Sequence, residues 1–173
     1  MILIRPTTPV HDRLEMYRGI AIAFADSPLV ESVANRARHR HAHLAALGVA
    51  EPLAASILRE VQSMRLYRPD DPGPDQLWAP NEVLGDRGGG DCEDLAVLVA
   101  SVARACGVRF VIEWLNRRET GNPQSHVTVL LSPDNGETYQ YAEACIDDAA
   151  FGEHPLEAAA RVKSTMRERI EGR

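Results

Sequence analysis

Gly-Gly-Gly-Asp-Cys-Glu-Asp, residues 88–94, leads directly into a long apolar run. Glycines let the backbone turn sharply and leave room for another molecule to approach. The run that follows is apolar almost all round and stops at Gly107, which predicts a buried central helix capped by that glycine. A thiol on the first turn of such a helix lies at the positive end of the peptide dipole, which favours the thiolate. We therefore expect Cys92 to be an exposed, activated thiol at a helix N-terminus.

Three strand-like runs follow this helix and predict a small antiparallel sheet. Residues 109–115 and 126–131 are rich in β-branched, aromatic and other apolar side chains, and residues 139–146 form a third run. The turn signal Pro-Asp-Asn-Gly, residues 133–136, separates the second run from the third. We therefore expect the last two runs to form a β-hairpin.

The hairpin predicts a contact between a histidine and a carboxylate. A four-residue loop closed by Ser132 and Glu137 would place His126 directly opposite Glu143, with Cβ atoms about 5 Å apart. The carboxylate would then fix the tautomer of the imidazole and stabilise its charged form. A register shift of two residues would put Cys145 opposite His126 instead. Asp147 is the rival acid because it has the same strand parity, although it falls beyond the paired region.

The order of these parts resembles the transglutaminase-like branch of the papain-like cysteine enzymes. In that branch a Gly-Asp-Cys opens a buried helix, a histidine starts the next-but-one strand, and an acidic residue lies on the strand after it. The matching stretch is about residues 78–155, and the resemblance is closest to transglutaminase-like proteins encoded in bacteriophages and prophages, on residues 67–72, 80–84 and 90–94. This chain departs from that pattern in having Glu143 rather than an aspartate, and Cys145 where threonine is common.

The resemblance implies a cysteine enzyme that acts on an amide carbonyl of a protein or peptide substrate. Cys92 would attack the carbonyl, His126 would move the proton, and Glu143 would orient the imidazole, as in a catalytic triad. The backbone N–H of Cys92 would stabilise the oxyanion, with a second donor from Gln76 or Trp78. The thioester would pass to water or to an amine. We favour hydrolysis by a protease or amidase over transamidation, because water is always present and no amine-binding feature is evident.

Two other functions fit the same residues. The chain could be a structural or assembly protein of a phage particle, with a vestigial site and with its helical N-terminal part as a docking surface for phage structural proteins. It could also be a thiol redox or binding module that uses Cys92 and Cys145. Cys106 ends the buried helix and is expected to be inert.

Three histidines, His39, His41 and His43, raise the question of a metal site. On a helix only His39 and His43 share a face, and no cysteine or acidic cluster stands nearby to complete a site. His41 falls on the apolar stripe, so we expect a core histidine with satisfied hydrogen bonds. The sequence therefore predicts neither a metal nor a cofactor.

Periodicity divides the chain into a helical N-terminal part, residues 1–68, and a catalytic core, residues 69–173, which we expect to form one compact unit. Helices are predicted over residues 12–25, 28–47, 52–68 and 155–170. Leu29 and Val33 should lie on the buried stripe of the second helix. Because the helices cluster at the N-terminus instead of alternating with strands, the fold class is α+β, with the cysteine-bearing helix packed on the small sheet.

Composition limits the kinds of partner and the cellular compartment that we expect for the protein. The chain has 173 residues, which suffices for a sizeable core. Its net charge of −6 and sequence pI near 5.5 argue against nucleic acid as the main partner. The apolar run at residues 19–25 is far shorter than a membrane span, so we expect no membrane. Three cysteines without a pairing pattern suit a reducing compartment. We therefore expect the protein in the cytoplasm, or in a virion if it belongs to a phage.

Overall fold

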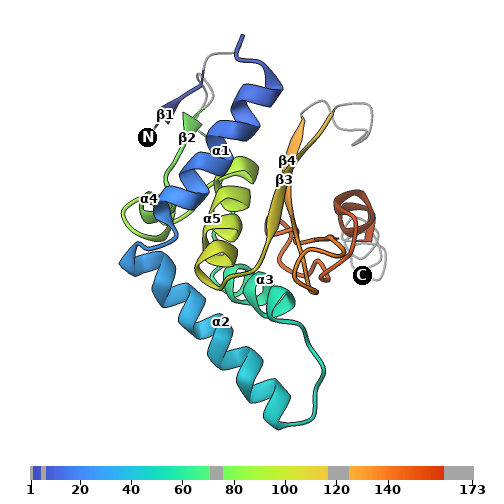
Figure 1. The fold of residues 1–173 in the computed structure, drawn as a ribbon. Coiled ribbons are helices and arrows are strands. Elements are labelled where there is room, and N and C mark those ends of the chain that lie inside the picture. The colour runs from blue at the N-terminus through green and yellow to red at the C-terminus, as the bar shows by residue number, and fades with distance from the viewer. Residues whose placement is uncertain (1, 5–6, 71–75, 117–124, 162–173) are drawn as a thin grey trace, which may run out of the picture.

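The computed structural model describes residues 2–4, 7–70, 76–116 and 125–161, and these form a mixed α/β fold (Figure 1). The helices are α1 (Val10–Phe24), α2 (Pro28–Ala46), α3 (Leu53–Ser63), α4 (Pro80–Leu84) and α5 (Cys92–Ala105). The strands are β1 (Ile2–Leu3), β2 (Gln76–Leu77), β3 (Phe110–Leu115), β4 (His126–Leu131) and β5 (Gln140–Tyr141). Residues 155–161 are also helical, and the rest of the helix predicted over residues 155–170 lies outside the described residues.

α5 lies at the centre of the molecule, between the other helices and the sheet (Figure 1). Every residue from 93 to 103 is buried, as expected for a sequence that is apolar almost all round. Gly107 follows the helix with φ +75°, a left-handed conformation that glycine adopts without strain. The predicted buried central helix is therefore confirmed. Neither α5 nor any other helix in the described ranges is long and apolar enough to cross a membrane.

The N-terminal helices share one hydrophobic core with α5 and the sheet. Tyr17 of α1, Val33 of α2 and Ile57 of α3 are buried in the same cluster as Leu98 of α5 and Leu131 of β4. This continuity means that the helices before residue 68 are packed directly against the elements that carry the candidate site.

α2 begins as the sequence predicts, but its far end leaves the core. Ser27 caps the helix by accepting the N–H of Val30 at 3.3 Å through its hydroxyl oxygen. None of residues 38–46 is buried, and the second half of α2 extends beyond the other helices (Figure 1). Leu29 is 43% exposed, so its predicted place on the buried stripe is wrong. Its side chain lies at the rim of the molecule, near Gly85 at the end of α4.

α3 ends at Ser63, earlier than predicted, and the chain after it turns toward the cysteine. Arg65 adopts φ +51°, which breaks the helix. The next residues pair with Gly90, whose N–H donates to the carbonyl of Leu66 at 2.9 Å and whose carbonyl accepts the N–H of Arg68 at 2.8 Å. The segment after α3 and the glycine turn before α5 are therefore held together by backbone hydrogen bonds.

β3, β4 and β5 form an antiparallel sheet with the strands in sequence order. At one end of the sheet Leu115 of β3 pairs with His126 of β4. Leu130 of β4 pairs with Tyr141, whereas the predicted hairpin would have paired it with Tyr139. The hairpin prediction is therefore two residues out of register, and β5 is much shorter than the predicted run over residues 139–146.

The turn between β4 and β5 explains the shift. The hydroxyl oxygen of Ser132 accepts the N–H of Gly136 at 2.5 Å, and the carboxylate of Asp134 accepts the N–H of Thr138 at 2.8 Å. These bonds close a loop that is longer than four residues, so regular pairing resumes only at Gln140. The turn signal predicts the position of the turn correctly, but side-chain hydrogen bonds within the turn set the length of the loop.

Two small features escaped prediction. β1 and β2 form a separate antiparallel pair, and two-residue strands carry no alternation that a sequence pattern could reveal. α4 begins at Pro80, where Glu82 reaches back to accept the N–H of Ala79 at 2.9 Å. Proline at the first helical position and an acidic residue in the first turn are typical of a helix start.

Candidate active site

Cys92 is the first residue of α5, and its sulfur lies against the start of β4. Asp91 precedes it as the N-cap residue, with φ −89° and ψ −157°. The backbone N–H of Val127 lies close enough to the thiol of Cys92 to lower its pKa, and α5 packs directly on β4. The thiol is therefore next to the strand residue that follows His126.

The glycine turn before Cys92 is filled by the protein's own atoms. A Cβ on Gly89 would lie 2.4 Å from the carbonyl oxygen of Leu66, and a Cβ on Gly90 would lie 2.4 Å from the Cβ of Asp94. The expectation that the glycines leave room for another molecule is therefore wrong at these two positions. They allow the segment after α3 and the first turn of α5 to pack closely instead.

Asp94 ties the first turn of α5 to the segment before α4. Its carboxyl group accepts the N–H of Trp78 at 2.6 Å and the N–H of Asp91 at 3.3 Å. The side chain is fully buried, and this burial outweighs the two backbone hydrogen bonds and raises the pKa of Asp94 to about 8. Asp94 is therefore largely protonated at neutral pH and adds little negative charge beside Cys92.

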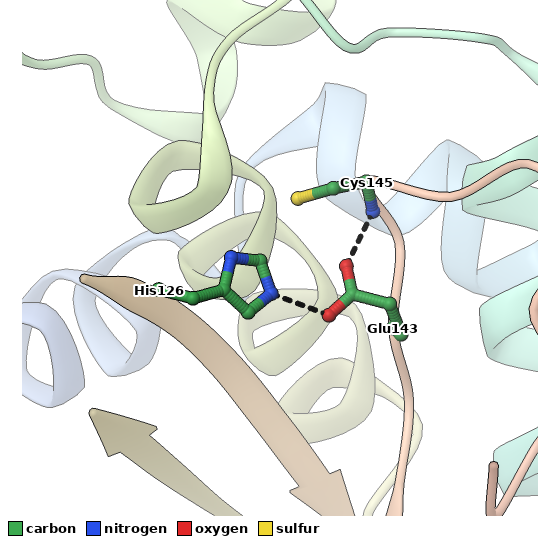
Figure 2. Close-up of side chains that lie close together, drawn as sticks. All are labelled: His126, Glu143 and Cys145. Atoms are coloured by element: carbon green, nitrogen blue, oxygen red, sulfur yellow. Dashed lines mark hydrogen bonds and ion pairs between the residues drawn. The ribbon is translucent and has the colours of Figure 1, made fainter. Parts of the chain in front are cut away.

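His126 and Glu143 are joined by a short hydrogen bond (Figure 2). Nε2 of the imidazole lies 2.6 Å from Oε2 of the carboxylate. The side chain of His126 is 23% exposed, whereas that of Glu143 is 1% exposed. The second oxygen of Glu143 accepts the N–H of Cys145 at 2.8 Å. The carboxylate is thus fixed from two sides, and the imidazole reaches both the carboxylate and the surface.

His126 and Glu143 are in contact as predicted, although β4 and β5 do not pair in the predicted register. Continuing the observed β4–β5 register would place Cys145 opposite His126, and Glu143 one diagonal step away. Regular pairing stops at Ala142, whose N–H donates to the carbonyl of Val129 at 2.8 Å. The long side chain of Glu143 then spans the diagonal, a distance that long side chains can bridge.

Glu143 is ionised at neutral pH. Burial by itself would raise the pKa of Glu143, but the hydrogen bond and charge of His126, together with the N–H of Cys145, lower it below its usual value. An ionised carboxylate only accepts hydrogen bonds, so Nε2 of His126 must carry the proton of their shared bond. In the neutral imidazole Nδ1 is then the nitrogen with a free lone pair, as a general base requires.

The surroundings of Cys92 and of Cys145 oppose ionisation of their thiols, contrary to the predicted activated thiolate. Burial, followed by the charges of Glu93 and Asp91, raises the pKa of Cys92 well above its usual value. The sulfur of Cys92 lies 3.2 Å from Oε2 of Glu93. Burial and the charge of Glu143 likewise raise the pKa of Cys145 well above normal. Desolvation and neighbouring carboxylates therefore outweigh the helix dipole.

Cys145 brings a second thiol to the site. Its sulfur, a ring nitrogen of His126 and a carboxylate oxygen of Glu143 all lie within 4.8 Å of one another, and the sulfur lies beside the imidazole (Figure 2). Cys106 instead lies just beyond the other end of α5, where its thiol donates to the carbonyl of Ala34 at 3.7 Å. The redox role weighed for Cys92 and Cys145 stays a prediction.

The rival acid and the two proposed oxyanion donors lie in different surroundings. Asp147 is exposed, whereas Glu143 is buried against the imidazole. Gln76 lies in β2, where it pairs with Leu3. The ring of Trp78 lies 4.4 Å from the guanidinium of Arg87, and within the described residues its buried Nε1–H has no hydrogen-bond partner. Both residues therefore remain candidates for the second oxyanion donor.

Gln62 was missed by sequence reasoning. It is 4% exposed on α3, and its side-chain nitrogen donates to the carbonyl oxygens of Glu143, Ile146 and Ala149, each at 3.0 Å. The available signal was a glutamine four residues after Leu58 on the buried face of an amphipathic helix, because a polar residue on such a face needs partners.

The histidines of α2 do not gather into a metal-binding group. In the described part of the chain, the groups close enough to share an ion are His126–Glu143–Cys145 and Asp91–Cys92–Glu93. His39 and His43 line an open surface pocket with Arg36, which pairs with Glu60 at 3.4 Å. Nδ1 of His41 is buried and lacks a hydrogen-bond partner among the described residues, so the expectation that its hydrogen bonds are satisfied is wrong.

In comparisons with known proteins, the chain matches no protein-family model, no curated protein and no solved structure.

Proposed function

We propose that the protein is a cysteine hydrolase that cleaves an amide bond in a protein or peptide through Cys92, His126 and Glu143. The observation that carries this proposal is the 2.6 Å hydrogen bond between His126 and Glu143. The next residue of the same strand, Val127, lies beside the thiol of Cys92. A nucleophile, a base and a group that orients the base are the parts of a catalytic triad. The resemblance to transglutaminase-like enzymes supports the same assignment, since a cysteine-bearing helix packed on an antiparallel sheet is the core that it implies.

The neutral thiol determines when the proton moves. Because the pKa of Cys92 lies well above normal, the proton leaves during the attack and not before it. As the sulfur bonds to the carbonyl carbon, Nδ1 of His126 takes the thiol proton and the C=O electron pair moves to oxygen. Ionised Glu143 stabilises the resulting imidazolium through Nε2. The backbone N–H of Cys92 and the indole N–H of Trp78 are the donors proposed for the oxyanion.

The intermediate then collapses to a thioester. The imidazolium of His126 gives its proton to the amine as the C–N bond breaks. Water next attacks the thioester, His126 takes a proton from that water, the C–S bond breaks, and the proton returns to the sulfur of Cys92. We favour water over an amine as the acceptor because His126 is partly exposed and water is always present.

The test uses p-nitrophenyl acetate, an activated ester that acylates a competent thiol without the natural substrate. We expect release of p-nitrophenolate and an acetyl group on the peptide that contains Cys92, found by mass spectrometry. Cys92→Ala should abolish this adduct, and His126→Ala and Glu143→Gln should slow its formation on the order of 10²-fold or more. Cys106→Ala is the matched control and should react like the wild type. Unchanged acylation of Cys92 in the His126→Ala protein overturns the proposal.

A second candidate is an assembly protein of a phage particle with a vestigial site. The projecting end of α2 favours it, because Leu47 after that helix is 65% exposed and nearby Val49 is 47% exposed, and exposed apolar side chains that lie together suit docking. This role would place the protein in a virion, whereas the hydrolase is proposed to work in the reducing cytoplasm. Co-sedimentation with particles, together with a Cys92 that p-nitrophenyl acetate leaves unmodified, is the result expected from the assembly protein alone.

A further inference from the structure

We propose that His126, Glu143 and Cys145 form a binding site for a thiophilic divalent metal ion of the Zn²⁺ type. The three side chains offer a nitrogen, an oxygen and a sulfur that all lie within 4.8 Å of one another (Figure 2). These are the three ligand types that zinc takes in proteins. The sulfur selects against Mg²⁺ and Ca²⁺, which bind oxygen ligands.

The site needs only a small rearrangement. Metal–ligand bonds of about 2.0–2.3 Å place neighbouring ligands of a tetrahedral ion about 3.3–3.8 Å apart. The present separation between Nε2 of His126 and Oε2 of Glu143 is 2.6 Å, so their hydrogen bond must open to admit the ion. On binding, the proton on Nε2 is replaced by one taken up at Nδ1, and the thiol of Cys145 releases its proton to solvent. One proton is therefore lost overall for each ion bound.

The surrounding structure holds the ligands in place. Glu143 and Cys145 come from one short segment, in which the second carboxylate oxygen of Glu143 accepts the N–H of Cys145 at 2.8 Å. Gln62 fixes the backbone of that segment at 3.0 Å. Outer groups of this kind orient metal ligands and strengthen binding.

The charges around the site suit a cation. Glu143 supplies a carboxylate within the group, and Asp91 and Glu93 place two more carboxylates beside Cys92, with ligand atoms within 4.8 Å of one another. The same negative potential that opposes a free thiolate attracts a divalent ion, and the ion in turn stabilises the thiolate that binds it. A bound ion would therefore stabilise the thiolate of Cys145 beside the carboxylate of Glu143.

Metal binding is independent of turnover, but its consequence for activity rests on the proposed hydrolase. An ion on Nε2 of His126 breaks the bond to Glu143 and leaves a proton on Nδ1, so the imidazole is no longer a base. We therefore expect Zn²⁺ to inhibit acylation of Cys92 reversibly, with activity restored by a chelator.

The test titrates the full chain with Co²⁺ under anaerobic conditions and follows the near-ultraviolet thiolate-to-cobalt absorption. We expect this band in the wild type and in Cys106→Ala, and its displacement by Zn²⁺. Cys145→Ala and Cys145→Ser should both lose it, and His126→Ala should weaken binding at least tenfold. Two substitutions at position 145 are used so that a folding defect in one is not mistaken for loss of a ligand. Circular dichroism of each variant checks the fold.

Absence of the band in the wild type, or its persistence in Cys145→Ser, overturns the metal site. Cys92→Ala separates the two proposals, because it should keep the cobalt band while losing acylation. A protein that binds Co²⁺ but never acylates Cys92 overturns the hydrolase alone. A protein that acylates Cys92 and ignores Co²⁺ overturns the metal site alone.

Discussion

The side-chain amide of Gln62 donates to the backbone carbonyl of Glu143 at 3.0 Å, across 81 positions of the chain. The same nitrogen lies 3.0 Å from the carbonyl oxygens of Ile146 and Ala149. The primary amide of Gln62 has two protons, which the three carbonyl oxygens share. A single side chain on α3 therefore holds residues 143–149 in place. The acid that binds His126 is therefore positioned by the N-terminal helices as well as by its own strand.

Gln62→Leu should lower the free energy of unfolding by about 1–3 kcal/mol, because buried carbonyl oxygens lose their donor. Urea denaturation measures this loss. Acylation of Cys92 by p-nitrophenyl acetate should also slow, since Glu143 is released from its position. Ser63→Ala, at the exposed neighbouring position, is the control and should change stability by less than about 0.5 kcal/mol. Equal losses in the two variants would contradict the proposed role of Gln62.

Glu93→Gln should make Cys92 more reactive. Burial and then the charge of Glu93 raise the pKa of this thiol, so removing the charge lowers the pKa and increases the thiolate fraction at a given pH. Iodoacetamide alkylation of Cys92, read by peptide mass spectrometry over a pH series, should shift to lower pH in this variant. The wild-type profile should lie above the ordinary thiol value of about 8.5. Glu157→Gln, at an exposed position, serves as control. A wild-type Cys92 that reacts at lower pH than free cysteine contradicts the neutral-thiol assignment.

Asp94 should make the protein less stable as pH rises toward 8. Its folded-state pKa of about 8 exceeds the unfolded value of about 3.9, so between these values the folded state holds a proton that the unfolded state has released. The free energy of unfolding therefore falls with rising pH, by at most about 1.4 kcal/mol per pH unit from this group.

Asp94→Asn removes this titration. Urea denaturation at several pH values between 5 and 8 should give a flatter dependence for the variant than for the wild type, on the order of 1 kcal/mol per pH unit. The comparison between the two proteins cancels the other titrating groups. Parallel curves would show that Asp94 is ionised in the folded state.

Gly90→Ala should destabilise the protein, because the new Cβ would lie 2.4 Å from the Cβ of Asp94. Overpacking of this kind costs about 1–3 kcal/mol. Gly19→Ala is a matched control of opposite sign: it lies in α1 with open space around the new Cβ, so it should stabilise by about 0.5–1 kcal/mol. Thermal or urea denaturation measures both. A tolerated Gly90→Ala would show that the turn can move away from α5.

The sequence predicted the structure correctly where a local pattern of residues is compatible with few structures. The apolar run after Cys92 has no polar face, so a buried helix was the remaining choice, and glycine at position 107 marked its end. The turn signal located the hairpin. His126 and Glu143 came together because a two-residue error in register still leaves them on a reachable diagonal. The hairpin prediction therefore identified the pair through parity and side-chain length, while its register was wrong.

The rest depended on contacts that only the folded chain creates. Ser132 and Asp134 set the loop length through side-chain hydrogen bonds that no pattern encodes. The state of Cys92 follows from burial and from the position of Glu93, which oppose the helix dipole. Gln62 is one polar residue on an apolar face, and its partners lie more than 80 positions away. The sequence correctly predicted that Cys92 begins a helix and that His126 begins a strand, but the protonation state of the thiol depends on the folded structure.

The hydrogen bonds that Gln62 on α3 donates also set an order of events during synthesis. Gln62 emerges from the ribosome long before Glu143 and Ala149, and domains begin to fold as they are made. Until those later residues arrive, the Gln62 amide has no carbonyls to hold and His126 has no acid. In the proposed hydrolase, the nascent chain therefore carries Cys92 before the His126–Glu143 pair can form, and the site is completed only in a late step of synthesis.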